Sequence, residues 1–486
     1  MLRRLFPILH VLGLIVFIFG LSMLSPLLLS EFSRDGAQRA YDEAALITLG
    51  SGLFLWSIGR HWRRELKTRD GILLVVLTWT LLPAFAALPL LIYMPDLSLA
   101  DAYFEAMSGL TATGATVLSG LDKLPDSINL WRAQMHWLGG LGVIVLVTAV
   151  LPLLGVGGRQ MFKAETPTPM KDQKLTPRMA ETAKGLWVVY VILTAACIGA
   201  LWALGMSFFD AVVHAFSIMS LGGFSSHDAS LGYFDSLPIE IAVGIFALVA
   251  GVNFATHFAF LRGRRFGYYW NDPELRWFLG FVLTSGVALA FLLWQRDVFL
   301  DFPSALRYSV FNTISVATTL GFATTDYGHW PFFAGLWLMF LCSFSTGAGS
   351  TGGGIKMMRA ILLYKQVYRE LKKLIHPSAE IPLRLGEDVV PNKTVYAVLA
   401  FLFIYVASIV SLSFVLSFTG LDVLTSFSAI VACINNTGPG LGQVGPAYTY
   451  AVFNNFQTTV CTFAMLLGRL ELFTLLVVLT PAFWRK

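Results

Sequence analysis

Long apolar segments alternate along the chain with short polar or basic loops, a pattern typical of a protein that crosses a membrane many times. Two apolar segments, at about 7–29 and 44–58, come first. We interpret the first as a retained transmembrane helix, because it is longer than the about 7–15 apolar residues of a cleavable signal. Four pairs of long apolar segments follow, at about 71–93 with 130–154, 184–204 with 239–261, 275–294 with 331–364, and 394–418 with 450–484. The pattern predicts about ten spans.

Between the two segments of each pair lies a short half-apolar stretch that runs into a glycine-containing segment. The stretches 101–114 and 210–223 share their opening Asp-Ala, a later Ala, a Ser and the final Gly, and fainter copies end at 318–321 and 435–438. Each stretch is shorter than the about 20 residues of a spanning helix. A re-entrant hairpin of this kind survives at membrane depth only where protein buries it or where it lines a water-filled path.

The sequence therefore predicts an all-α polytopic membrane protein in which four pseudo-repeated helix–pore loop–helix units surround one central pore. An N-terminal two-helix hairpin precedes them. The expected boundaries are 1–69 for the hairpin and 70–160, 161–270, 271–375 and 376–486 for the four units.

Composition supports a membrane protein and argues against other classes. Hydrophobic residues form 56% of the chain and charged residues 13%, against about 25% charged in ordinary soluble domains. The net charge of +5 comes from bases in loops on one predicted side, chiefly 60–69, 158–183, 262–265 and 365–393. This distribution predicts cytoplasmic termini and hairpins that enter from outside, rather than nucleic-acid binding.

The chain shows no P-loop or nucleotide fingerprint, and no convergent acids, metal triad or activated nucleophile, so we expect no enzymatic activity. The four cysteines lie far apart in apolar stretches and indicate neither a disulfide framework nor a metal site. We expect His136, His214 and His257 to be polar groups at helix contacts rather than metal ligands.

The hairpin tips carry the candidate chemistry. A dehydrated cation needs several oxygen ligands, and backbone carbonyls from four converging loops would supply them. Glycine permits the backbone angles that aim successive carbonyls inward. The predicted lining consists of Thr111, Ala112, Thr113, Gly114, Ser220, Leu221, Gly222, Gly223, Thr318, Thr319, Leu320, Gly321, Asn435, Asn436, Thr437 and Gly438. The alternative is that these glycines only let helices pack closely.

Two further features lie within predicted spans. The glycine run 344–354 interrupts the last segment of the third unit, where each glycine weakens a helix by about 1 kcal/mol relative to alanine. Arg469 lies in the final segment, and a charge at mid-depth costs at least about 2.5–3.5 kcal/mol unless it faces a cavity or a partner. The alternatives are a packing kink for the glycine run, and snorkelling or pairing with Glu471 for the arginine.

Four units with one glycine each at the same place resemble the TrkH/KtrB/HKT superfamily of potassium transporters, over nearly the whole chain. The matching glycines are Gly114, Gly223, Gly321 and Gly438. The extra N-terminal hairpin is similar to the TrkH branch rather than to the shorter KtrB branch. The resemblance implies K⁺ uptake, as a multi-pass protein, across the bacterial inner membrane.

The resemblance also implies partners and a gate. Members of this branch are usually homodimers in the lipid bilayer and work with a cytoplasmic nucleotide-binding regulatory subunit of the TrkA type. No cofactor is expected on this chain beyond K⁺ as the transported ion. The family places a mobile gating loop at the stretch matching 344–354 and an arginine barrier at the position of Arg469. The gating residues implied are Gly347, Gly349, Gly352, Gly353, Gly354 and Arg469.

Several alternatives stay open from the residues alone. Asp228 and Asp326 follow their glycines by the same interval, and they act either as cation-attracting acids at the outer mouth or as ordinary solvated loop charges. Na⁺ or mixed K⁺/Na⁺ translocation competes with K⁺ conduction. In the plant relatives a serine replacing the first glycine goes with Na⁺ conduction, so Gly114 favours K⁺. H⁺- or Na⁺-coupled symport is the third alternative, although its typical inverted repeat is not what the sequence shows.

Overall fold

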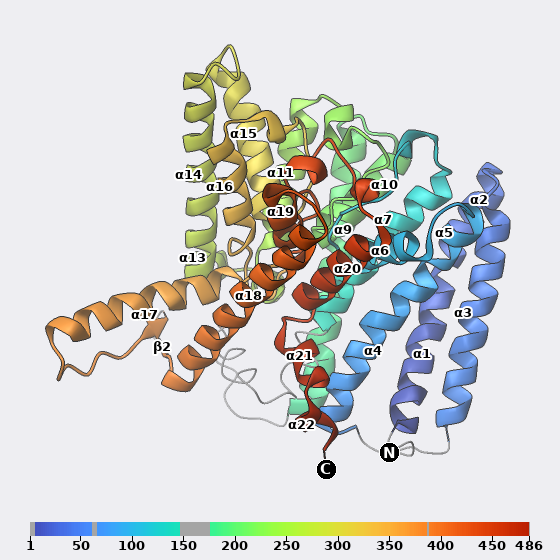
Figure 1. Cartoon of the computed structure of the whole chain (residues 1–486), viewed down its shortest axis with the longest axis horizontal. Helices are drawn as coiled ribbons and strands as arrows, with labels where there is room; N and C mark the ends of the chain where they lie inside the picture. The colour runs from blue at the N-terminus through green and yellow to red at the C-terminus, as the bar shows by residue number, and fades with distance from the viewer. Residues whose placement is uncertain (1–4, 61–65, 146–174, 386–387, 486) are drawn as a thin grey trace.

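The computed structural model describes residues 5–60, 66–145, 175–385 and 388–485, and this part of the chain is almost entirely helical. The long helices run side by side in one bundle, with the beginning of α1 and the end of α22 at the same end (Figure 1). Apart from their ends, helices satisfy their backbone hydrogen bonds within one segment, which the bilayer interior requires. The expected all-α membrane fold is confirmed.

Many large apolar side chains face outward instead of inward. Phe403 is 75% exposed and Phe418 93% exposed along the same helix. A monomeric soluble protein rarely displays so much contiguous apolar surface. This outer surface is suited to lipid.

The N-terminal hairpin consists of two closely packed arms. Its helices are α1 (Phe6–Ser22), α2 (Leu24–Ser33) and α3 (Gln38–Gly59). Gly13 and Gly52 permit the approach, since a Cβ on either would lie closer than 3.0 Å to backbone of the facing helix. The second arm begins at Gln38, several residues before the expected start at 44.

The remaining helices follow the expected order of outer helix, short helix and outer helix. In the first expected unit they are α4 (Thr68–Ala86), α5 (Leu88–Tyr93), α6 (Leu99–Leu110) and α7 (Asp126–Val145). In the second they are α9 (Leu175–Ala203), α10 (Phe208–Ser220), α11 (Leu237–Gly251), α12 (Phe254–Gly263) and α13 (Gly267–Trp270). In the third they are α14 (Pro273–Gln295), α15 (Phe302–Ala317), α16 (Phe332–Cys342) and α17 (Met357–Ile375). In the fourth they are α18 (Asn392–Phe418), α19 (Val423–Ile434), α20 (Asn455–Arg469), α21 (Phe473–Leu479) and α22 (Pro481–Trp484).

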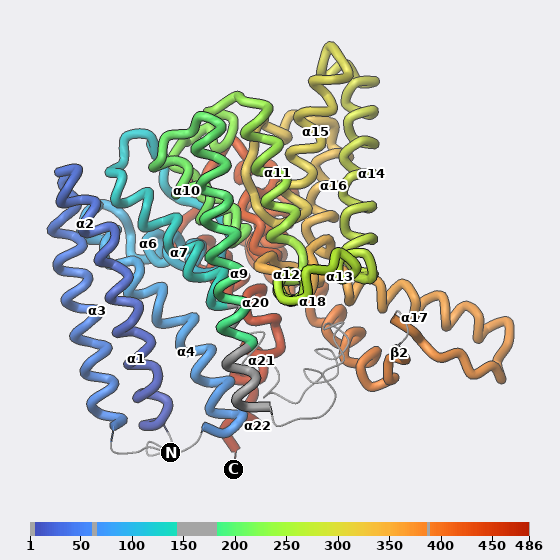
Figure 2. Tube along the Cα trace, turned by 180° about the vertical axis from the view of Figure 1, so that it is seen from behind, coloured from blue at the N-terminus to red at the C-terminus, as the bar shows by residue number. Residues whose placement is uncertain are grey.

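Short elements complete the described chain. Single turns of 3₁₀-helix follow the glycine segments at η2 (Leu121–Lys123), η5 (Ser230–Tyr233), η6 (Tyr327–His329), η7 (Gly442–Val444) and η8 (Tyr450–Val452). Strands β1 (Arg384–Leu385) and β2 (Asp388–Val389) pair antiparallel beyond α17. Helix α17 leaves the bundle sideways and carries this hairpin with it (Figure 2).

Two outer helices that the sequence predicts as continuous are broken. The expected helix 239–261 bends by 93° between α11 and α12, and the expected helix 450–484 bends by 115° between α20 and α21. At the first break the Asn253 side chain accepts the Ala255 N–H at 2.9 Å and starts a new helix. At the second, Glu471 and Leu472 both have a φ of 51°, which no α-helix accommodates.

The span count of about ten stays a prediction. By length and apolar composition, five described helices are long enough to cross a membrane, or up to seven if each bent pair counts once. The end of the expected segment 130–154 and most of the basic loop 158–183 lie outside the described residues, as do 61–65.

Candidate functional site

The four short helices α6, α10, α15 and α19 start in the same way. Each has a Ser or Asp N-cap whose side chain accepts the N–H three residues later. These caps are Ser98, Ser207, Asp301 and Asp422. A cap of this type stabilises a helix by about 1 kcal/mol. The opposite, carbonyl end of each helix runs into its glycine, and it carries a partial negative charge.

Each of these helices ends in the same backbone turn, which we call a glycine loop. The four loops are 111–114, 220–223, 318–321 and 435–438. Two residues before each glycine the φ is positive, between 50° and 64°, and the glycine itself has a φ between 81° and 90°. The intervening residue always donates its N–H to the carbonyl five positions earlier, for example Thr113 to Ser108 at 2.9 Å and Leu320 to Ser315 at 2.8 Å. A positive φ at a non-glycine residue is strained by about 1–3 kcal/mol, and such strain clusters at functional sites.

The four glycine loops close a ring. A Cβ on Gly114 would lie closer than 3.0 Å to the carbonyl of Gly222, and Gly223, Gly321 and Gly438 face the carbonyls of Leu320, Thr437 and Thr113 in the same way. The glycine of each loop thus faces a carbonyl of the next loop in chain order, and the glycine of the fourth loop faces a carbonyl of the first. No residue larger than glycine fits at these positions without displacing the next loop.

The carbonyls at this ring are available to a ligand. Within the described chain, those of Thr113, Gly222, Leu320 and Thr437 accept no hydrogen bond. Two residues farther along the second and third loops the carbonyls are engaged, because Phe224 O and Phe322 O accept from the Ser217 and Ser315 hydroxyls at 2.6 Å each. The Gly438 carbonyl differs from the other glycines in accepting the Tyr450 hydroxyl at 2.9 Å. Four uncommitted oxygens on one ring suit a dehydrated cation.

Polar side chains behind the ring hold the segments that follow the glycines. In three of the short helices, the residue nine positions before the loop glycine is polar. Its side chain contacts a residue that lies two or three positions after the same glycine. Glu105 accepts the Val117 N–H at 3.0 Å, His214 contacts the Ser225 hydroxyl at 3.0 Å, and the Asn312 amide donates to Thr324 at 2.9 Å. In the fourth helix Ser428 accepts the Leu441 N–H at 2.8 Å.

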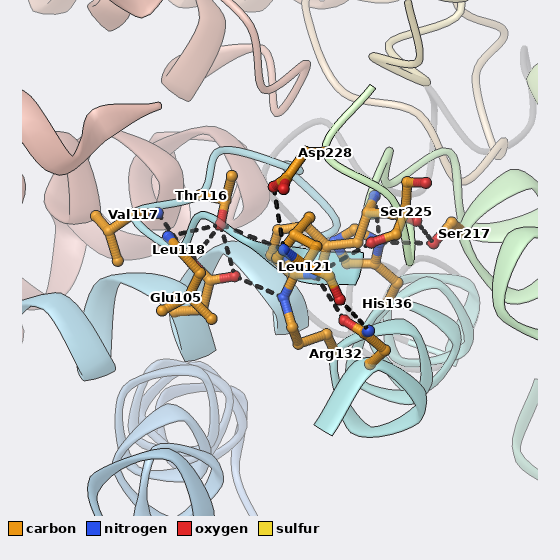
Figure 3. A network of polar contacts seen from close by, with 12 residues as sticks. Glu105, Thr116, Val117, Leu118, Leu121, Arg132, His136, Ser217, Ser225 and Asp228 are labelled. Carbon is orange, nitrogen blue, oxygen red and sulfur yellow. Dashed lines mark hydrogen bonds and ion pairs between the residues drawn. The ribbon is translucent and has the colours of Figure 1, made fainter. Parts of the chain in front are cut away.

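The first of these braces is a buried ion pair (Figure 3). Arg132 Nε lies 2.8 Å from Glu105 Oε1, and the two side chains are 1% and 0% exposed. The arginine also donates to Ser225 O at 3.1 Å and lies 4.2 Å from the centre of the Phe224 ring. The pair therefore connects the outgoing segments of the first and second glycine loops. The pair was not predicted from the sequence, although two charged residues between apolar segments were a usable signal.

The glycine run forms an irregular segment directly under the ring, and we call residues 343–356 the inner loop. It contacts the ends of three short helices. Thr351 donates to Met219 O at 3.1 Å, Gly353 N–H donates to Thr319 Oγ1 at 3.1 Å, and a Cβ on Gly353 would lie closer than 3.0 Å to Asn435 O. Its polar residues Thr346 and Thr351 are fully buried. The inner loop covers one side of the ring.

Arg469 connects the inner loop to α7 of the first expected unit. Its side chain is 5% exposed. One guanidinium nitrogen donates to Thr351 O at 2.9 Å, and another donates to Gly139 O of α7 at 3.0 Å. Glu471, a candidate partner from the sequence, lies 2.5 Å from Arg359 instead. A cavity of about 30 Å³ borders Arg469, Lys356 and the glycines of the inner loop, with space for about two waters.

The remaining predicted residues are the two outer-mouth acids and two of the histidines. Asp228 accepts the Leu121 N–H at 3.1 Å, and Asp326 accepts the Gly328 N–H at 2.8 Å as the cap of η6. Both acids thus shape the outer loops. His136 packs against Gly222, where an added Cβ would strike its ring, and stacks on Phe224. His257 contacts Val249 O at 2.9 Å across the first helix break.

Comparisons with known proteins agree over the whole length. Residues 40–486 match the model of the TrkH family, described as cation transport protein. The chain is 46% identical over 480 residues to the Trk system potassium uptake protein TrkH of Salmonella typhimurium, covering 98% of this chain and 99% of that one. It is 37% identical to TrkG of Escherichia coli over 98% of both chains. The crystal structure of the potassium transporter TrkH from Vibrio parahaemolyticus superposes with a TM-score of 0.92 at 42% identity, covering 99% of this chain and 100% of that one. This chain therefore belongs to the TrkH family of cation transport proteins.

Proposed function

We propose that this protein takes up K⁺ across the bacterial inner membrane through the ring of four glycine loops. The observation that carries the proposal is the closed ring itself, in which four equivalent carbonyls accept no hydrogen bond within the described chain. The relatives are named as potassium uptake proteins, which supports K⁺ as the ion. In this proposal the ring is a selectivity filter, and we use that name below.

The proposed driving force is electrical. A negative interior supplies about 2.3 kcal/mol per charge per 100 mV, so K⁺ accumulates without ATP hydrolysis on this chain. One glycine per unit provides a short filter, which we expect to select less sharply than a filter with several successive layers.

The inner loop is the proposed gate. It lies against the filter, its glycines pack on the filter backbone, and a cavity of only about 30 Å³ lies beside it. Conduction requires the inner loop to move. Arg469 opposes this movement through its two carbonyl contacts, and its charge repels a cation beneath the filter.

The proposed setting follows the family. Basic residues concentrated at one end of the bundle support cytoplasmic termini. The relatives are components of a Trk system, which supports the proposal of a TrkA-type nucleotide-binding regulatory subunit. A homodimer is proposed on the same basis. Nothing in the four-loop site requires a bound cofactor for conduction, and we propose no enzymatic activity.

Cation fluxes in proteoliposomes test the proposed function. Purified protein is reconstituted alone, and uptake of K⁺, Rb⁺, Na⁺ and Li⁺ is measured separately under an imposed negative potential. We expect K⁺ and Rb⁺ to enter well ahead of Na⁺ and Li⁺. Equal or faster Na⁺ entry would favour the Na⁺ or mixed-cation alternative instead.

A further inference from the structure

Glu274 is a buried acid that the predicted site did not include. It is the second residue of α14, directly after Pro273, and its side chain is 4% exposed. Asp272 caps the same helix and accepts the Glu274 N–H at 2.9 Å. A carboxylate is tolerated here because the N-terminus of a helix carries a partial positive charge.

One oxygen of Glu274 contacts both the inner loop and the helix that follows it. Oε1 accepts the Ala348 N–H at 2.7 Å and the Met358 N–H at 3.0 Å. Ala348 lies within the inner loop, and Met358 is the second residue of α17, which follows it. The loop cannot leave the filter as a unit without stretching or breaking one of these contacts.

The contact to Met358 replaces a missing helix cap. The first N–H groups of any α-helix lack partners within that helix. Lys356, at the N-cap position of α17, provides no side-chain hydrogen bond to them. Glu274 thus caps α17 from a different helix, and a charged acceptor makes a hydrogen bond roughly twice as strong as a neutral one.

The bend between α11 and α12 holds the inner loop on either side of Ala348. The Gly347 N–H donates to Gly251 O at 2.9 Å, and the Phe254 N–H donates to Gly349 O at 3.2 Å. These are neutral backbone contacts, whereas Glu274 contributes a charge. The Glu274 carboxylate therefore binds the middle residue of a three-residue stretch, 347–349, whose two outer residues contact the second unit.

We propose that Glu274 is a positioning residue of the gate and that its carboxylate clamps the inner loop in the blocking position. The inference rests on the proposed role of the inner loop as the gate. When the inner loop opens, the two N–H groups that Glu274 binds must find other partners. The clamp therefore contributes to the free-energy difference between the closed and open forms.

The test compares two variants at the start of α14. Glu274→Gln keeps the size of the side chain and removes its charge. Asp272→Asn is the matched control, because asparagine also caps helices well and the side-chain hydrogen bonds of Asp272 within the described chain go to Thr256, Glu274 and Leu275 rather than to the inner loop. Basal K⁺ flux is measured in proteoliposomes containing the full chain alone. Hydrogen–deuterium exchange is followed separately for the segment 344–358.

For Glu274→Gln we expect basal K⁺ flux to rise about tenfold, equivalent to about 1.4 kcal/mol in the opening equilibrium. Exchange should accelerate in 344–358 and not in the short helices, and the K⁺ over Na⁺ ratio should not change. Asp272→Asn should behave as the parent protein.

An Arg469→Ala variant separates failure of the clamp from failure of the gate. Unchanged flux and exchange in Glu274→Gln, with raised flux in Arg469→Ala, would overturn the clamp and leave the gate intact. Unchanged flux in both variants would overturn both. If Glu274→Gln is too unstable for flux assays, hydrogen–deuterium exchange is measured on Glu274→Asp instead. Slow exchange at Ala348 and Met358 in that variant would contradict the clamp.

Discussion

At the scale of single residues, the site depends on positions where nothing but glycine fits. Gly223 combines a φ of 85° with a neighbouring carbonyl where its Cβ would lie. Gly244 is also buried and belongs to the same unit, but a Cβ there would meet only Ile314 Cδ1 at 3.7 Å, an ordinary contact.

These two glycines make a matched pair of substitutions. We expect Gly223→Ala to displace the Leu320 carbonyl and to lower the K⁺ over Na⁺ flux ratio severalfold. Gly244→Ala should leave the ratio unchanged, because its methyl group finds space. Ion-selective flux assays at equal reconstitution check this, and an unaltered ratio in Gly223→Ala would argue that this glycine does not face ions.

The Glu105–Arg132 pair gives a second prediction at this scale. Removing one partner of a buried pair typically costs about 3–5 kcal/mol, because a charge remains without compensation. Arg132→Met should therefore lower the unfolding temperature strongly. The double variant Arg132→Met/Glu105→Gln should recover part of the loss, because glutamine still accepts the Val117 N–H.

Thermal unfolding in detergent measures both effects, with K⁺ over Na⁺ selectivity as a second readout. A double variant no more stable than Arg132→Met would show that the uncompensated carboxylate is not the cause. Equal stability of all three proteins would remove the ion pair from the account of how the filter segments are held.

At the scale of elements, three interruptions of helices meet under the filter. The inner loop contacts the α11–α12 bend through Gly251 and Phe254, and it contacts the end of α20 through Arg469. The bend between α11 and α12 thus provides space and hydrogen-bond partners for the inner loop, which belongs to the third unit. This arrangement places free backbone groups where protein buries them, as membrane depth requires.

One of these three interruptions, the glycine run, was predicted from the sequence, and the other two were not. The glycine run 344–354 is dense enough to weaken a helix visibly. The other two breaks carry weaker signals in the sequence. Asn253 is a possible helix cap, whereas Glu471 and Leu472 are non-glycine residues whose positive φ only the structure shows, and the apolar patterns continue through both bends. Their geometry is imposed by tertiary contacts with the inner loop, which no local pattern encodes.

Arg469 provides the prediction for this scale. We expect Arg469→Ala to raise basal K⁺ flux severalfold or more, because the variant loses both the barrier charge and the bridge between Thr351 and Gly139. Arg469→Lys should give a smaller increase, since lysine retains the charge without the planar fork that reaches two carbonyls. Flux in proteoliposomes at equal protein content measures this, and a flux unchanged or lowered in Arg469→Ala would remove the barrier role.

At the scale of the whole molecule, fourfold repetition is what the sequence conveyed best. The four glycines and their position after a short helix were predictable because each hairpin is too short to span and recurs at the same place. The order of the loops around the ring, and the side chains that brace them, were not predictable. Those depend on contacts between segments distant in sequence, such as Arg132 with the Ser225 carbonyl and Asn436 with the Thr113 hydroxyl.

The measurement that tests the central claim most directly is K⁺ uptake into proteoliposomes under an imposed potential, with and without gradients of H⁺ and Na⁺. A passive pore predicts K⁺ entry that follows the electrical potential and is the same with or without the other gradients. Entry that vanishes when the H⁺ and Na⁺ gradients are abolished would show coupled symport, and the account of a passive four-loop filter would be contradicted.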